Sequence, residues 1–336
     1  MLDKMREYCS IDSPSGFEKN IREHILKEIS PFCECKVDRL GNIIAYKRGK
    51  LPSTVKLMVD AHLDEVGIII SAITPDGFLK FQMLGGIKPS VLLCRKVLIN
   101  NSVVGVIGCK PIHLTEKEEG KKLPGTDALY IDIGCSSRAE AENLVNLGDG
   151  GVLVSEFCDL GDGRIKAKAI DDRAGCCILS QILKTDSDYD FYATFTFGEE
   201  IGCRGAKTAA YAINPDAAIV LEATSAADLD GVASENTVCS LGKGPAVSFM
   251  DRGTVYDRDY YNAAVNSGIL CQTKRATTGG NNASQIHLSR EGVRTLAISV
   301  PCRYIHSPSG ICDISDIENA KKLTLYMIKK ICSGEI

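Results

Sequence analysis

Five short polar clusters follow apolar, strand-like runs in this sequence of 336 residues. Each contains a histidine or a carboxylate, which are side chains that bind divalent cations through nitrogen or oxygen. The clusters are His62-Leu63-Asp64, Asp171-Asp172, Glu199-Glu200, Glu222 and His306. Because open α/β sheets bind ligands in the crevice at the carboxyl ends of their strands, this repeated placement predicts that the five clusters converge on one metal site.

Two divalent cations balance the charges of these groups better than one. With a bridging hydroxide, the carboxylates of Asp171, Glu200 and Glu222 would supply four negative charges, and a crevice of low dielectric constant requires such a balance. The neutral imidazoles of His62 and His306 would complete the coordination. We therefore expect two divalent metal ions, of zinc, cobalt or manganese, as cofactors.

The adjacent Glu199 and Glu200 need not serve the same purpose, because neighbouring side chains on an extended chain point in opposite directions. We interpret Glu200 as a metal ligand and Glu199 as the general base. Glu199 would take a proton from the metal-bound water that attacks and pass it to a leaving amine. Asp64 lies two residues after His62, on the same face of a strand, and would fix the tautomer of that imidazole.

Each cluster taken alone also has a purely structural interpretation. The His62-Asp64 spacing could be incidental, Asp171-Asp172 could cap the helix that follows, and Glu199-Glu200 could form a solvated rim. The functional interpretation depends on all five clusters meeting in one crevice.

The surrounding pattern predicts an α/β fold with an insertion. Residues 1–65 and 163–336 alternate strand-like runs with amphipathic helices, as expected for a sheet covered by helices on both faces. One such helix is expected over residues 17–30, with Ser15 available as its cap. Residues 66–162 are almost entirely short strand-like runs broken by Gly, Asn and Pro, which predicts a small inserted β-barrel.

Composition excludes several classes of partner. The net charge is −4, from 39 basic and 43 acidic residues, and no Lys/Arg run is dense enough to follow a nucleic-acid backbone. No apolar stretch reaches the roughly 20 residues of a membrane-spanning helix. The fifteen cysteines include no CxxC pair, which favours reduced thiols. We therefore expect a cytoplasmic protein that binds neither nucleic acid nor membrane.

Four motifs together resemble one known family. VDAHLDEVG (59–67), AIDDRAG (169–175), GEEIGCRGA (198–206) and RYIHSP (303–308) are similar in order and spacing to motifs of the glutamyl and tetrahedral aminopeptidases. These are dinuclear metallopeptidases that include proteins once labelled endoglucanase. The resemblance covers essentially the whole chain and implies a three-layer αβα catalytic domain with a PDZ-like β-barrel insert. It also implies a hollow homo-oligomer of twelve subunits that admits short peptides.

The resemblance further implies how the ligands are shared. His62, Asp171 and Glu222 would hold one metal, and Asp171, Glu200 and His306 the other. Asp171 would bridge the two ions, and the peptide bond that follows it is often cis in such enzymes.

Two positions depart from the family pattern. Glu222 stands where the family commonly has Asp, which keeps the charge but lengthens the side chain. The segment GGNNASQIH (279–287) stands where the family often has GGTDAGAIH. This segment lies near the substrate pocket in relatives, so Asn282, Ser284 and Gln285 are the predicted substrate-binding residues.

The leading hypothesis is an aminopeptidase that hydrolyses the N-terminal residue of short peptides. A glycosidase is a second hypothesis, because paired carboxylates also hydrolyse sugars. It would leave both histidines and Asp171 without a role, and the chain has no Trp for a sugar platform. A non-catalytic metal-binding scaffold of the same fold is the third.

Overall fold

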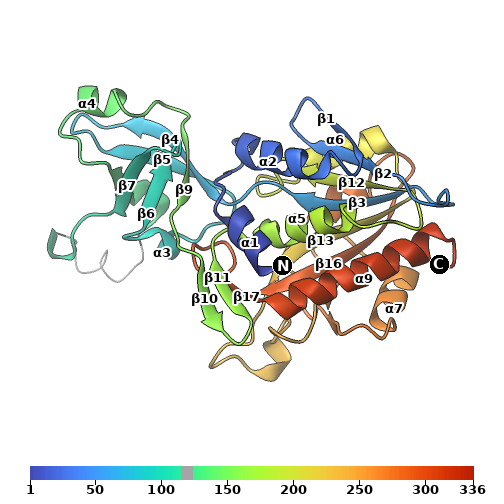
Figure 1. The fold of residues 1–336 in the computed structure, drawn as a ribbon. Helices are drawn as coiled ribbons and strands as arrows, with labels where there is room; N and C mark the ends of the chain where they lie inside the picture. The colour runs from blue at the N-terminus through green and yellow to red at the C-terminus, as the bar shows by residue number, and fades with distance from the viewer. Residues whose placement is uncertain (115–123) are drawn as a thin grey trace.

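The computed structural model describes residues 1–114 and 124–336 of the chain. Figure 1 shows an α/β body, in which helices lie on both sides of a twisted sheet, and a separate small barrel at one end of it. Within the described residues, no helix is long and apolar enough to cross a membrane. All fifteen cysteines are free thiols.

The main sheet has eight strands, of which the central four are parallel. Its order is β1 (Glu34–Val37), β2 (Ile43–Lys47), β12 (Phe191–Thr196), β3 (Leu57–His62), β13 (Ala217–Ser225), β16 (Arg294–Cys302), β14 (Ala246–Val247) and β15 (Gln272–Thr273). Strands β3, β13 and β16 are buried almost throughout, as expected for parallel strands covered on both faces. Because β12, β3, β13 and β16 are parallel, their carboxyl ends meet at one edge.

Helices form a layer on each face of this sheet. One layer contains α1 (Leu2–Cys9), α2 (Lys19–Ile29), α5 (Ile170–Leu183), α7 (Arg258–Val265) and α9 (Ile314–Cys332). The other contains α6 (Arg204–Ile213) and α8 (Ala283–Ile286). The α/β class with a doubly covered sheet, expected from the alternating pattern, is what the structure shows.

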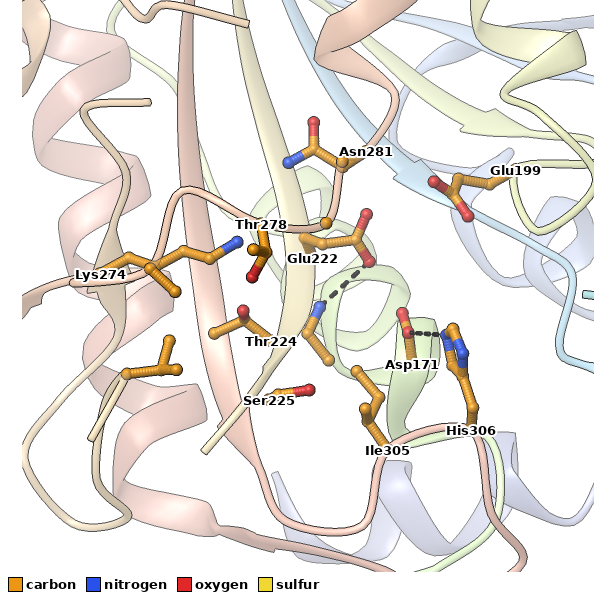
Figure 2. Close-up of a pocket in the computed structure, with 15 residues that line it drawn as sticks. Asp171, Glu199, Glu222, Thr224, Ser225, Lys274, Thr278, Asn281, Ile305 and His306 are labelled. Carbon is orange, nitrogen blue, oxygen red and sulfur yellow. Dashed lines mark hydrogen bonds and ion pairs between the residues drawn. The ribbon is translucent and has the colours of Figure 1, made fainter. Parts of the chain in front are cut away.

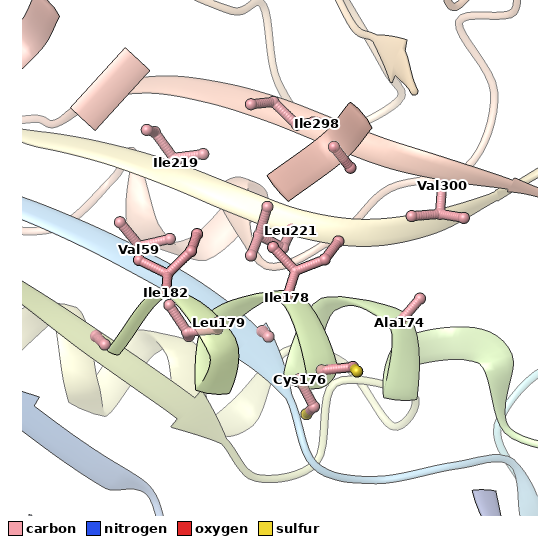
Figure 3. Close-up of a cluster of buried hydrophobic side chains, with 14 of the residues drawn as sticks. Val59, Ala174, Cys176, Ile178, Leu179, Ile182, Ile219, Leu221, Ile298 and Val300 are labelled. Carbon is pink, nitrogen blue, oxygen red and sulfur yellow. The ribbon is translucent and has the colours of Figure 1, made fainter. Parts of the chain in front are cut away.

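Helix α5 lies at the centre of the larger core. Figure 3 shows Ile178 and Ile182 of α5, one turn apart, against apolar side chains of β3, β13 and β16. Both isoleucines are at most 2% exposed, and burial of such a side chain contributes roughly 1.5–3 kcal/mol. This packing fixes the start of α5, where Asp171 lies, relative to the ends of the strands.

The inserted unit is a closed six-stranded barrel with its own apolar core. Its order is β4 (Gly67–Ile73), β5 (Leu79–Leu84), β8 (Tyr130–Asp132), β7 (Val103–Gly108), β6 (Lys96–Ile99) and β9 (Gly150–Leu153). The remaining short helices of the described residues are α3 (Pro89–Leu92), α4 (Arg138–Glu142), η1 (Ile112–Leu114), η3 (Thr126–Ala128) and η4 (Ser234–Asn236).

Two local features differ from the sequence-based expectation. The strand before Asp171, β11 (Arg164–Ala167), does not join the main sheet but pairs with β10 (Cys158–Gly161) and β17 (Gly310–Asp313). Ser15 does not cap α2, which begins at Lys19 without a side-chain cap. Its hydroxyl instead donates a 2.5 Å hydrogen bond to Asp64 Oδ2, because Gly16 (φ +93°) turns the chain before the helix starts.

Arg173 of α5 joins the N-terminal segment to the end of β3. Its guanidinium is fully buried and donates to the backbone oxygens of Tyr8, Leu63 and Ile11 at 3.1, 2.6 and 3.1 Å. It also donates to Ser13 Oγ and lies 3.6 Å from Glu65 Oε1. Leu63 directly follows His62, so Arg173 supports the site as well as the fold.

We expect Arg173→Met to lower the free energy of unfolding by about 3–5 kcal/mol, because it leaves the buried backbone oxygens of Tyr8, Leu63 and Ile11 without their donor. Urea unfolding of metal-free protein would measure this without a contribution from bound ions. The control is Arg39→Met at an exposed arginine, where a change within about 0.5 kcal/mol is expected. Equal stabilities of the two variants would contradict this account of Arg173.

Candidate active site

The structure brings all five predicted metal ligands into one crevice at the edge of the main sheet. His62 is the last residue of β3, Glu222 lies on β13, and Glu200 follows β12. Asp171 lies in the first turn of α5, and His306 lies in the loop after β16. The sequence places these residues up to 244 positions apart, yet the ends of parallel strands collect four of them, as expected, and the start of α5 supplies Asp171.

The two oxygens of Asp171 face two different histidines. Asp171 Oδ1 lies 3.1 Å from His62 Nε2, and Asp171 Oδ2 lies 3.3 Å from His306 Nε2. The contact between Asp171 and His306 is drawn in Figure 2. Each histidine also has a second carboxylate: Glu222 Oε1 is 3.3 Å from His62 Nε2, and Glu200 Oε2 is 3.4 Å from His306 Nε2. The site therefore consists of two His–Glu pairs that share one carboxylate.

The charges of this site call for cations. Burial, with the nearby charge of Asp171, raises the pKa of both Glu200 and Glu222. Although burial opposes it, contact with Glu222 and Asp171 raises the pKa of His62. Among the described residues, Glu200 Oε1 is buried without a hydrogen-bond partner. Buried carboxylates that face imidazole nitrogens, with an oxygen left over, fit divalent metal ions.

Asp172 also lies near the site, but its carboxylate accepts hydrogen bonds from the backbone. One of its oxygens lies within 4.8 Å of the ligand atoms of His62 and Glu222. Its carboxylate, however, accepts the backbone N–H groups of His62 (3.2 Å) and Gly175 (2.8 Å). These bonds join the start of α5 to the end of β3. The peptide bond between Asp171 and Asp172 is cis.

Asp64 holds the first histidine and the glutamate pair in place. Its Oδ1 lies 3.2 Å from His62 Nδ1, and its two oxygens accept the backbone N–H groups of Glu199 (2.9 Å) and Glu200 (3.1 Å). The Ser15 hydroxyl also donates a hydrogen bond to Asp64 Oδ2. Because Asp64 is fully buried, it orients these groups without reaching a substrate.

The side chains of Glu199 and Glu200 diverge. Glu199 lines the largest cavity at the site, where Figure 2 shows its carboxylate pointing inward, whereas Glu200 points to His306. Burial, helped by the charge of Asp171, raises the pKa of Glu199 to about 7. Its Oε1 accepts a 3.5 Å contact from the Cys203 thiol. A carboxyl group with such a pKa can both accept and release a proton near neutral pH.

The cavity beside the ligands has a volume of about 270 Å³. The three predicted substrate-binding residues do not line it. Asn282 is buried and donates to Asp60 Oδ2 (2.7 Å) and Thr196 Oγ1 (2.8 Å), Ser284 Oγ lies 3.8 Å from Cys203 Sγ, and Gln285 lies on α8. Asn282 thus anchors the loop before α8 to the sheet.

Other residues of that region form the wall instead. They include Lys274, Thr278 and Asn281, together with Thr224 and Ser225 beyond Glu222 on β13. Sequence reasoning missed Lys274 and Asn281. Asn281 lies in the glycine-rich segment itself and Lys274 shortly before it, and this position was the only signal, because neither residue belongs to a periodic pattern.

A parallel sheet whose edge presents histidines and carboxylates, with a barrel inserted into the chain, defines an α/β metallohydrolase. The chain matches the family described as M42 glutamyl aminopeptidase over residues 41–323. Since this match covers most of the chain, the protein belongs to that family of metallopeptidases and is a peptide hydrolase.

Individual relatives extend the similarity to the full length. A lysyl aminopeptidase of Pyrococcus furiosus is 32% identical, with 96% of this chain and 95% of the relative covered. The TET aminopeptidase of a marine sediment Thaumarchaeota archaeon has a similar structure, with a TM-score of 0.94, 32% identity and coverage of 98% and 96%. The Pyrococcus horikoshii TET1 peptidase can assemble into a tetrahedron or a large octahedral shell. Its structure matches with a TM-score of 0.85 and 32% identity, and the match covers 97% of this chain and 98% of that peptidase.

Proposed function

We propose that this protein is an aminopeptidase that uses two divalent metal ions to remove the N-terminal residue of short peptides. The observation that carries the proposal is the position of Asp171 between two His–Glu pairs. His62, Glu222 and Asp171 would hold one ion, and His306, Glu200 and Asp171 the other. Zinc, cobalt and manganese suit these ligands. When bound, such ions polarise the scissile carbonyl and make an attacking water more acidic.

The protein's own groups would then handle the proton. Glu199 Oε would take a proton from the attacking water and deliver it to the leaving amine. Two observations support this role: the carboxylate lines the cavity, and its backbone N–H is held by Asp64. A fixed base beside the cavity needs little rearrangement during the reaction.

The competing hypotheses account for fewer features of the site. A glycosidase needs only two carboxylates, which leaves His62, His306 and Asp171 unexplained. A non-catalytic scaffold needs the ligands but not Glu199, a buried carboxylate that contacts the cavity and has an unfavourable environment for its charge.

The test is hydrolysis of aminoacyl p-nitroanilides with free or N-acetylated amino groups, with and without a chelator. We expect metal-loaded protein to cleave the free substrates only, and to lose activity after chelation. Cleavage of the acetylated substrates would instead indicate a deacylase or endopeptidase. Chelator-resistant cleavage of a cellulose analogue would favour the glycosidase.

The solved structures suggest a quaternary state. Since the TET1 peptidase forms a dodecamer and can form a tetrahedron, we propose that this chain forms a homododecamer in which the barrel, of PDZ-like type, contributes contacts. A monomeric mass in light scattering would contradict this. The free thiols support a reducing, cytoplasmic location.

A further inference from the structure

Lys274 is a buried lysine in the wall of the cavity. Only 7% of its surface is exposed, and Figure 2 shows its side chain extending into the cavity from the side opposite Glu199. Across residues 1–114 and 124–336, no carboxylate forms an ion pair with its ammonium group. Lysines are almost never this buried without a partner, so the ammonium is available to a ligand in the cavity.

The backbone around Lys274 is fixed. Its N–H donates to the Val247 carbonyl at 2.9 Å, which continues the pairing of β15 with β14. Two residues earlier, Gln272 Nε2 donates to the carbonyls of Ser240 (2.9 Å) and Gly244 (2.7 Å). The position of the ammonium is therefore set by the sheet edge rather than by a free loop, which lowers the cost of ordering it around a ligand.

The cavity leads from the metal ligands to Lys274. Glu222 and Thr224 alternate on β13 and so lie on the same face of the strand. Both line the cavity, as does Thr278, whose side chain lies beside Lys274 in Figure 2. A substrate whose carbonyl lies near Glu222 would extend its first side chain toward an ammonium and two hydroxyl groups. These are hydrogen-bond donors suited to a carboxylate.

We propose that Lys274 makes this aminopeptidase selective for substrates with an acidic N-terminal residue, glutamate or aspartate. The inference depends on the proposed function. Family membership does not settle the matter, because the family description names glutamyl substrates while a relative is a lysyl aminopeptidase. Their side chains carry opposite charges, and an unpaired ammonium in the cavity attracts only the acidic one.

Lys274 has two other conceivable partners. It could balance the ligand carboxylates, but two divalent ions would already do so, and no carboxylate among the described residues pairs with it. It could bind the free C-terminal carboxylate of a very short peptide. Aminoacyl p-nitroanilides lack that carboxylate, so a preference measured on them reports the N-terminal side chain alone.

The experiment compares kcat/KM for the p-nitroanilides of Glu, Gln, Leu and Lys with metal-loaded wild type, Lys274→Met and Lys274→Glu. Glu and Gln differ almost only in charge, and a buried charge pair contributes at least about 30-fold. We expect wild type to prefer Glu over Gln by that factor, and Lys274→Met to lose the preference while still cleaving the Leu substrate. Lys274→Glu is expected to favour the Lys substrate.

The matched control is Lys243→Met, at an exposed lysine outside the cavity wall, which is expected to keep the wild-type preference. Equal rates of wild type on Glu and Gln, or a preference that survives in Lys274→Met, would overturn the role of Lys274 and leave the aminopeptidase proposal intact. Wild type that cleaves none of the four unblocked substrates would overturn both.

Discussion

Glu199→Gln is expected to reduce kcat by roughly 100- to 10,000-fold, the usual contribution of a general base, and to leave the bound metal unchanged. The amide has nearly the same shape as the carboxylate but cannot accept the proton of the attacking water. Glu199 lines the cavity and forms no ion pair with His62 or His306, whose carboxylate partners include Glu222 and Glu200. Its loss should therefore affect proton transfer rather than coordination.

The neighbouring residue supplies the control for this prediction. Glu200→Gln makes the same chemical change one position further on, but removes a charge that faces His306 at 3.4 Å. We expect this variant to lose metal, and to lose activity for that reason. Metal content by mass spectrometry, measured beside kcat and KM, separates the two cases. If Glu199→Gln remained fully active or lost metal as Glu200→Gln does, the assigned roles would be wrong.

A KM that changes little in Glu199→Gln would support the same conclusion, because a base that acts during bond cleavage contributes little to binding of the ground state. A large rise in KM with unchanged kcat would instead make Glu199 a substrate-binding residue.

The convergence of the five polar clusters could be predicted from the sequence for a physical reason. Runs such as KLMVDA are mostly apolar, which is typical of buried parallel strands, and they end directly before a polar group such as His62. Parallel strands of one sheet must end at a common edge, so ligand positions follow from strand positions. The main fold class followed from the same pattern.

The pattern was less informative where no sheet imposes a direction. In the segment GGNNASQIH, Asn281 faces the cavity while Asn282 turns to Asp60. Which of the two asparagines faces the cavity depends on the turn at Gly279 (φ +78°) and on the buried carboxylate of Asp60, which is distant in the sequence. Lys274 directly follows β15, an edge strand of only two residues. Such a short strand gives no periodic signal in the sequence.

The strand before Asp171 shows a related limit. The alternation in IKAKAI correctly indicates a strand, but alternation does not say which sheet the strand joins. It pairs with β10, its neighbour in the chain, and with β17, which lies far away in the sequence. Asp171 is therefore positioned by the packing of α5 on the main sheet rather than by a strand end.

That position makes Asp171 the residue whose change should affect metal binding most. We expect Asp171→Asn to weaken both sites, each by more than about 100-fold, because even a residue that only orients a ligand typically contributes 10- to 100-fold to metal affinity. The amide keeps the shape of the side chain but removes the one charge shared by the two His–Glu pairs.

Calorimetric titration of the metal-free protein with zinc measures this effect. Wild type should bind two equivalents per chain, and Asp171→Asn should bind neither tightly. Glu222→Gln is the informative comparison, since of the two histidines its carboxylate faces His62, and its loss should weaken one equivalent and leave the other nearly unchanged. Two tight equivalents in Asp171→Asn would show that the ions do not share this carboxylate, and the dinuclear arrangement proposed for the site would fail with it.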